Sequence, residues 1–250
     1  MPRYRVTVEY DGTPFVGWQR QPNGPSVQEA LENAGHALSG VPAPVYGAGR
    51  TDAGVHALGM TAHIDLQKAY PPRTVKGALN AHLRPLPIAV LDAEEAPENF
   101  HARFSCRGRH YLYRVLNRRS PAALLQKRVW NVAPPMDVAP MVDAAQTLVG
   151  KHDFTTFRST QCQAESPVKT LSTFTVERVG EEITFKLFAP SFLHNQVRSL
   201  VGTLVQVGLG RWSVGDVAAA LTAKDRSRCG PVAPANGLYF VKADYGDNAF

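Results

Sequence analysis

Alternating apolar and polar residues begin the chain and predict a β-strand over residues 3–10. The turn-forming run Asp11-Gly12-Thr13-Pro14 closes this strand. Ser26-Val27-Gln28-Glu29 then has the form of a helix capping box, and apolar residues at helical spacing continue to about Leu38. Further patterns predict strands near 45–46, 60–66 and 85–91 and a helix over 73–81. The first part of the chain therefore has a predicted β-α-β-β-α-β order.

The second part of the chain repeats this scheme loosely. Residues 109–116 alternate as a strand, and segments 172–178 and 183–188 predict a hairpin across Gly180. Apolar stripes predict helices over 136–148, 193–207 and 213–221. A closing strand is expected over 237–243.

Together these patterns predict an α+β fold of two ferredoxin-like-type halves, 1–104 and 105–250. Each half is expected to have an antiparallel sheet flanked by helices, with the join near 97–108. Because ligands often bind between domains, we expect an active-site cleft between the halves.

Composition narrows the class of partner. The chain has 250 residues, 44% of them hydrophobic, and a net charge of +6. No acidic residue lies between Glu98 and Asp137, a stretch rich in arginine. The aromatic residues Phe100, Phe104, Tyr111 and Tyr113 are interleaved with these arginines. A solvated basic face would give the same charge run, but the mixture of rings and guanidinium groups suits looped or single-stranded RNA.

The cysteines and the N-terminus indicate a cytoplasmic protein. Cys106, Cys162 and Cys229 are far apart and odd in number, which argues for reduced thiols rather than a disulfide framework. No CxxC or HxxxH spacing is present, so we expect no structural zinc site. The N-terminus has no secretory h-region, and no apolar run is long enough for a transmembrane span.

The run Gly47–Ala57, Gly-Ala-Gly-Arg-Thr-Asp-Ala-Gly-Val-His-Ala, is the strongest candidate for chemistry. Asp52 is the only acidic residue between Glu32 and Asp65, and Arg50 stands two positions before it. A guanidinium near a carboxylate keeps it ionised, as a nucleophile or proton acceptor requires. Taken alone, the same run would fit an Asx-turn with a surface ion pair.

Several motifs in order carry a resemblance to one family. The chain resembles the TruA family of tRNA pseudouridine synthases from about Tyr4 to Tyr245, with Arg50-Thr51-Asp52-Ala53-Gly54-Val55-His56 as the most specific match. The other matching pieces are Glu9-Tyr10-Asp11-Gly12, Gly17-Trp18-Gln19-Arg20-Gln21, Ser26-Val27-Gln28-Glu29, Phe100-His101-Ala102-Arg103-Phe104 and Phe192-Leu193-His194-Asn195-Gln196-Val197-Arg198.

The resemblance implies roles for four residues. Asp52 matches the catalytic aspartate, and Arg50 matches an arginine that holds the carboxylate and helps to displace the target base. Tyr111 matches a tyrosine that stacks on the target uracil and takes part in proton transfer. Arg198, on a long C-terminal helix, matches the arginine that pairs with the aspartate. The chain departs from the family pattern at His110 and at Asn195-Gln196.

The resemblance also implies the reaction and the partner. Uridines at positions 38, 39 and 40, in the anticodon stem-loop of tRNA, become pseudouridine, with no cofactor and no metal. The family works as homodimers in which one tRNA crosses both subunits, and neither DNA nor a membrane takes part.

Two other functions remain open at this stage. A catalytically silent RNA chaperone would use the same basic surface without needing the Asp52 carboxylate. A nucleoside or glycoside hydrolase would need a second carboxylate as general acid, for which Asp11 and Asp65 are the nearest candidates in sequence.

Overall fold

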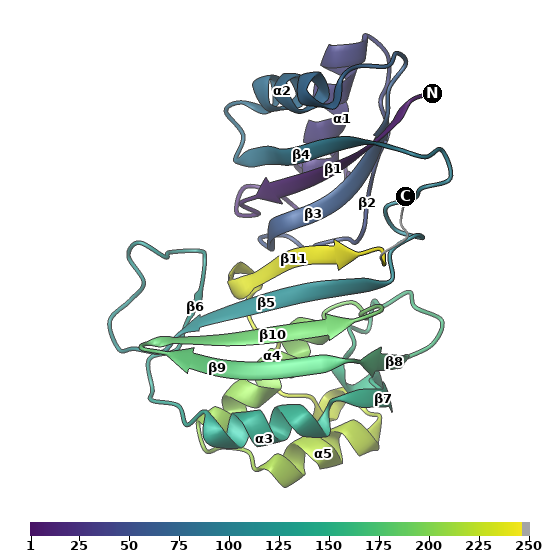
Figure 1. Cartoon of the computed structure of the whole chain (residues 1–250). Helices are drawn as coiled ribbons and strands as arrows, with labels where there is room; N and C mark the ends of the chain where they lie inside the picture. The colour runs from purple at the N-terminus through teal and green to yellow at the C-terminus, as the bar shows by residue number, and fades with distance from the viewer. Residues whose placement is uncertain (247–250) are drawn as a thin grey trace. The chain divides into compact units, whose positions relative to one another are not determined.

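The structure is a computed structural model that describes residues 1–246, and it divides into two compact units (Figure 1). The first unit consists of Met1–Arg107 and the segment from Tyr239 onward, and the second consists of Gly108–Leu238. The predicted halves, 1–104 and 105–250, differ from these units in two respects: the first unit continues to Arg107, and the C-terminal segment belongs with it. Each unit is a mixture of helices and strands, so the fold is α+β.

The first unit has the predicted β-α-β-β-α-β order. Its elements are β1 (Arg3–Tyr10), α1 (Val27–Ser39), β2 (Val45–Gly47), β3 (His56–Asp65), α2 (Pro72–Leu83) and β4 (Ile88–Ala96), joined by β11 (Leu238–Asp244). Strand β1 lies between β3 and β4 and is antiparallel to both. Strand β2 pairs antiparallel with residues 62–64 of β3, whereas β11 pairs parallel with residues 56–57.

Local signals explain why α1 begins and ends where predicted. The Ser26 side chain accepts a hydrogen bond from the Glu29 backbone N–H, which satisfies one of the open donors of the first turn. Gly40 ends the helix in the left-handed region, with φ of 76°. Val27, Leu31 and other apolar residues of α1 are buried, and the helix packs against α2.

Two strand predictions in the first unit were misplaced. Strand β3 begins at His56, before the predicted 60–66, because its first residues pair with β11 and are buried on nearly every position. Such a distant partner leaves no local alternation to recognise. Strand β4 begins at Ile88, after the predicted start at Pro85, since neither Pro85 nor Pro87 has an N–H to donate to a neighbouring strand.

The second unit contains a three-stranded antiparallel sheet in the order β5-β10-β9 and three packed helices, α3, α4 and α5. The short β6 runs parallel to β5, and β7 and β8 form a separate antiparallel pair that the sequence did not predict. The bounds are β5 (Gly108–Leu116), β6 (Trp130–Asn131), α3 (Ala139–Thr147), β7 (Gly150–Asp153), β8 (Val168–Leu171), β9 (Thr173–Val179), β10 (Glu182–Ala189), α4 (Gln196–Gly208) and α5 (Val214–Ala223). The order of elements therefore differs from that of the first unit.

Candidate functional site

In the first unit, the Asp52 loop connects β2 to β3 and is held by the segment after β1. The Trp18 backbone N–H donates to the Thr51 carbonyl oxygen at 3.0 Å, and Gly17 forms a β-bridge with Asp52. A Cβ added to Gly17 would lie 2.5 Å from the Thr51 carbonyl oxygen. Only a glycine lets the two backbones come so close.

The residues on either side of Asp52 are anchored in the interior. The Thr51 hydroxyl and the Tyr10 hydroxyl share a buried hydrogen bond of 2.8 Å. The Gly12 N–H donates to Nδ1 of His56 at 3.1 Å, and the His56 ring stacks on Tyr239. With its neighbours fixed in this way, the half-buried side chain of Asp52 is presented from a rigid loop.

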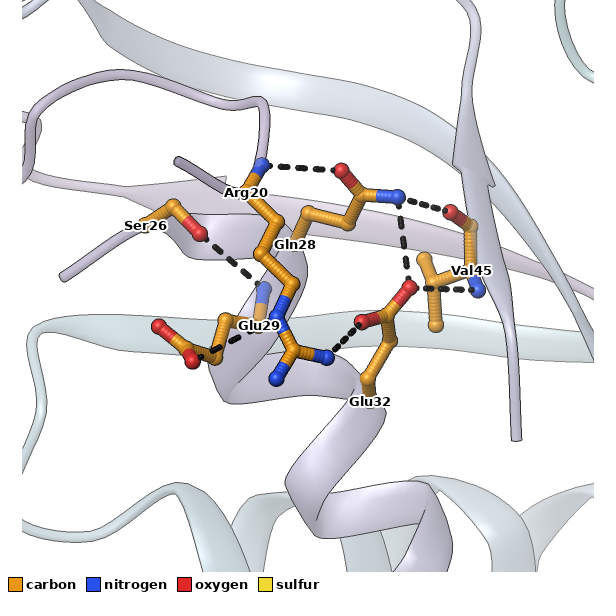
Figure 2. Close-up of polar contacts among 6 residues, drawn as sticks. All are labelled: Arg20, Ser26, Gln28, Glu29, Glu32 and Val45. Atoms are coloured by element: carbon orange, nitrogen blue, oxygen red, sulfur yellow. Dashed lines mark hydrogen bonds and ion pairs between the residues drawn. The ribbon is translucent and has the colours of Figure 1, made fainter. Parts of the chain in front are cut away.

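Polar contacts at the start of α1 join the segment after β1 to strand β2 (Figure 2). The Arg20 guanidinium forms ion pairs with Glu29 and Glu32, at 3.5 and 3.4 Å. The Gln28 side chain accepts from the Arg20 backbone N–H at 3.0 Å and donates to the Val45 carbonyl oxygen at 3.0 Å. One helix turn thus ties the segment that bridges Asp52 to the strand that leads into its loop.

Arg50 behaves differently from its neighbours. Its side chain is exposed, and within residues 1–246 no ion pair joins its guanidinium to the Asp52 carboxylate. The expectation that Arg50 holds the carboxylate and helps to displace the base stays a prediction. Its guanidinium is accessible to a ligand, and guanidinium groups suit phosphates and planar rings.

In the second unit, Tyr111 lies on β5 opposite Leu187 and is partly exposed. Its ring meets Phe192 edge-on, with centroids 5.1 Å apart. Tyr113, two residues further along, is fully buried and donates its hydroxyl to the Pro234 carbonyl oxygen at 2.7 Å. Burial raises the pKa of Tyr113, and the nearby Arg198 charge opposes this rise. Of the two tyrosines, only Tyr111 has ring surface available to a base.

Arg198 is held firmly in the first turn of α4. Its Nε donates to the Ala233 carbonyl oxygen at 2.8 Å, and its Nη1 donates to Oδ1 of Asn195 at 2.9 Å. The Ala233 N–H donates back to the Arg198 carbonyl oxygen at 3.0 Å. This approach of two segments requires Gly202, since a Cβ there would lie 1.8 Å from the Pro231 carbonyl oxygen.

Asn195 contacts a predicted site residue and was not itself among the predicted site residues. It is recognisable in the sequence only as a departure from the family pattern, yet its side chain orients the Arg198 guanidinium. Asn195 itself has a left-handed backbone with φ of 62°, which asparagine tolerates better than most residues. The three-residue spacing between Asn195 and Arg198, one helical turn, is the signal that points to the contact.

The structure thus places Arg50 and Asp52 together in the first unit, and Tyr111 and Arg198 in the second. No cluster of three or more metal-ligating side chains is found among residues 1–246. Within the same residues, no disulfide joins Cys106, Cys162 or Cys229. No helix in the described part of the chain is long and apolar enough to cross a membrane.

Comparisons with known proteins agree with the motifs. A curated relative named tRNA pseudouridine synthase A, from Afipia carboxidovorans, is 60% identical over 98% of this chain and 100% of its own. Relatives of the same name from Maricaulis maris and Rhodospirillum rubrum are 58% and 59% identical over 98% of this chain and over 98% and 88% of theirs. A solved structure titled "Crystal Structure of a Cbf5-Nop10-Gar1 Complex" aligns with a TM-score of 0.40 and 11% identity over 95% of this chain and 48% of that one, a likeness too slight to support an argument. A family model described as tRNA pseudouridine synthase matches residues 6–105 and 144–246, and the chain belongs to that family, as its motifs predict.

Proposed function

We propose that this protein converts uridine to pseudouridine in the anticodon stem-loop of tRNA. The observation that carries the proposal is the near-complete alignment with curated tRNA pseudouridine synthases A, at up to 60% identity. The rigid loop that presents Asp52 supports it. The same proposal includes a cytoplasmic homodimer as the working form, with neither DNA nor a membrane as partner.

Asp52 is the group that acts on the uridine. Pseudouridine formation breaks the N1–C1′ bond, turns the uracil and rejoins it to C1′ through C5, so no atoms are gained or lost and no redox cofactor is needed. An ionised carboxylate serves this reaction as a nucleophile, at C1′ of the sugar or C6 of the ring, or as the acceptor of a sugar proton.

Of the other three residues, Arg50 and Tyr111 position the base and Arg198 supplies charge. A uridine in a stem must leave the helix first, at an unstacking cost of about a few kcal/mol. The exposed Arg50 side chain is free to enter the vacated space, and Tyr111 offers ring surface to replace the lost stacking. Arg198, fixed by Asn195 and Ala233, supplies a preorganised positive charge for the same reaction.

The hydrolase alternative needs a second carboxylate as general acid, and its two nearest candidates in sequence, Asp11 and Asp65, lie in the first unit. A general acid needs a raised pKa. The Asp65 carboxylate instead accepts two hydrogen bonds of 2.7 Å from Arg3, which lower its pKa. Asp11 accepts the Thr13 backbone N–H at 2.9 Å and lies 3.1 Å from Nδ1 of His56, in a turn below the loop.

The experiment compares wild type with Asp52→Asn on unmodified tRNA. Carbodiimide-dependent reverse-transcription stops map pseudouridine, and chromatography detects released uracil. Wild type should give stops in the anticodon stem-loop without free uracil, whereas Asp52→Asn should give none. Full conversion by Asp52→Asn would refute the role of the carboxylate. Binding of tRNA by wild type with no conversion at all would favour an RNA chaperone. Free uracil would favour the hydrolase.

A further inference from the structure

An exposed group of aromatic side chains in the first unit has no role in the reaction described above. It consists of Tyr46 on β2 and of His101 and Phe104 in the loop after β4, and we name it the aromatic cluster. Phe104 is 76% exposed and Tyr46 is 47% exposed. The His101 ring lies 4.4 Å from Phe104 and 5.5 Å from Tyr46, measured between centroids. Three rings from two segments distant in the sequence therefore form one continuous surface.

A rigid base lies under the aromatic cluster. His63 of β3 is fully buried, stacks under Tyr46 at 5.0 Å and meets His101 at 4.7 Å. Its Nδ1 accepts the Ala102 backbone N–H at 3.1 Å, which fixes the loop that carries His101 and Phe104. The cluster is thus preorganised, so binding to it costs little side-chain entropy.

Hydrogen bonds within the loop add to this order. Nδ1 of His101 accepts the backbone N–H groups of Arg103 and Phe104 at 3.1 and 3.3 Å. The Arg3 guanidinium donates to the Phe100 carbonyl oxygen at 2.6 Å. The loop is therefore fastened to β1, and Phe104 projects from a fixed backbone.

The charges suit an unpaired nucleotide. Burial and the Arg3 charge lower the pKa of His63 to about 4, and burial also lowers the pKa of His101, so both rings are neutral at pH 7. The exposed Arg103 holds its guanidinium carbon 5.7 Å from the Phe104 ring centroid. An uncharged ring surface beside one guanidinium matches a base attached to its phosphate.

The aromatic cluster also shows which aromatic residues of the arginine-rich stretch are accessible to RNA. Of the four aromatic residues interleaved with arginines, Phe100 and Tyr113 are buried and bind nothing outside the protein. We propose that the aromatic cluster binds one unpaired base of the RNA substrate by stacking on Phe104, with Arg103 on the adjoining phosphate. Naming tRNA as that RNA rests on the proposed function.

The test measures binding of unmodified tRNA at fixed salt in an Asp52→Asn background, so that turnover does not interfere. Phe104→Leu keeps an apolar side chain but removes the ring, and Phe104→Trp keeps a ring. Base stacking on one aromatic side chain predicts about 5- to 150-fold weaker binding for Phe104→Leu and near-normal binding for Phe104→Trp. Leu91→Ala, an exposed apolar residue of β4, is the matched control and should bind normally.

Two further measurements decide the occupant. Arg103→Gln should reduce the slope of log Kd against log salt by roughly 0.7 to 1, as one lost phosphate contact requires. Light scattering reports the oligomeric state of each variant. Unchanged tRNA binding by Phe104→Leu overturns the proposal, and so does dissociation of a dimer by that variant, which would make a second copy of the chain the occupant. If wild type forms no pseudouridine but tRNA binding still depends on the Phe104 ring, the proposed function fails and the binding site stands.

Discussion

Replacing Gly17 with alanine should damage both the fold and the reaction, although residue 17 carries no functional group. Gly17 has φ of 123°, a conformation that L-amino acids rarely adopt, and it bridges the Asp52 backbone. A Cβ there would lie 2.5 Å from the Thr51 carbonyl oxygen and 3.2 Å from the Asp52 carbonyl carbon. The alanine methyl group therefore forces either residue 17 or the Asp52 loop to move.

The size of the effect follows from these two penalties. A non-glycine residue in a sparsely populated backbone region costs about 1–3 kcal/mol of stability. A shift of the carboxylate by about 1 Å costs on the order of 100-fold in rate. We expect Gly17→Ala to lower the free energy of unfolding by about 1–3 kcal/mol and the single-turnover rate constant by on the order of 100-fold. The Kd for tRNA should change little, because the RNA-binding side chains remain.

The assay pairs urea unfolding with single-turnover pseudouridine formation. Gly77→Ala is the matched control, because Gly77 is exposed in the middle of α2 and an added Cβ meets nothing within 4 Å. That variant should gain up to about 1 kcal/mol from helix propensity and keep the wild-type rate. A Gly17→Ala protein with wild-type stability and rate would show that close backbone approach does not position Asp52.

Three other outcomes test separate parts of the structure. Asn195→Ala removes the acceptor of Arg198 Nη1. Because a hydrogen bond to a charged group contributes about 1.5–3 kcal/mol, the single-turnover rate should fall by about 10-fold or more while the Kd for tRNA stays near that of wild type. Weaker tRNA binding with an unchanged rate would contradict this role. His63 is neutral in the folded protein because burial holds its pKa near 4, whereas the unfolded chain takes up a proton near pH 6.5. The unfolded state therefore binds more protons in this window, and urea midpoints should fall as pH falls from about 6.5 toward 4, more steeply for wild type than for His63→Gln; equal slopes would rule out His63 as the cause. Ser213→Ala removes half of the capping box with Asp216 at the start of α5 and should cost about 1 kcal/mol in urea unfolding, without an effect on the rate.

Local patterns in the sequence were enough to predict the elements that carry the site. The capping residues placed α1 within a residue of its observed ends, and alternation gave β1 and β5 almost unchanged. The motif around Asp52 lies in the loop between β2 and β3, and the backbone of that loop is held against Gly17 and Trp18.

Features that depend on distant partners could not be predicted. The early start of β3 depends on pairing with a strand nearly two hundred residues away, and the pairing of β7 with β8 crosses an irregular segment. Likewise, nothing in the spacing of Arg50 and Asp52 reveals that the arginine side chain turns outward. These outcomes are set by tertiary contacts, to which short-range patterns are insensitive.

The pairing of β11 with β3 has a consequence for synthesis of the chain. The first unit receives its last strand from residues that leave the ribosome after the whole second unit has been made. Until then residues 56–57 lack their strand partner, and Ala102 lacks the Tyr245 hydroxyl that donates to its carbonyl oxygen. The loop that leads into β3 bears Asp52 four residues before the strand begins, and it therefore acquires its final support only when translation is nearly complete. A nascent chain or a fragment without β11 would carry the aspartate on an incomplete sheet. The enzyme should therefore become active only after β11 has been synthesised and has paired with β3.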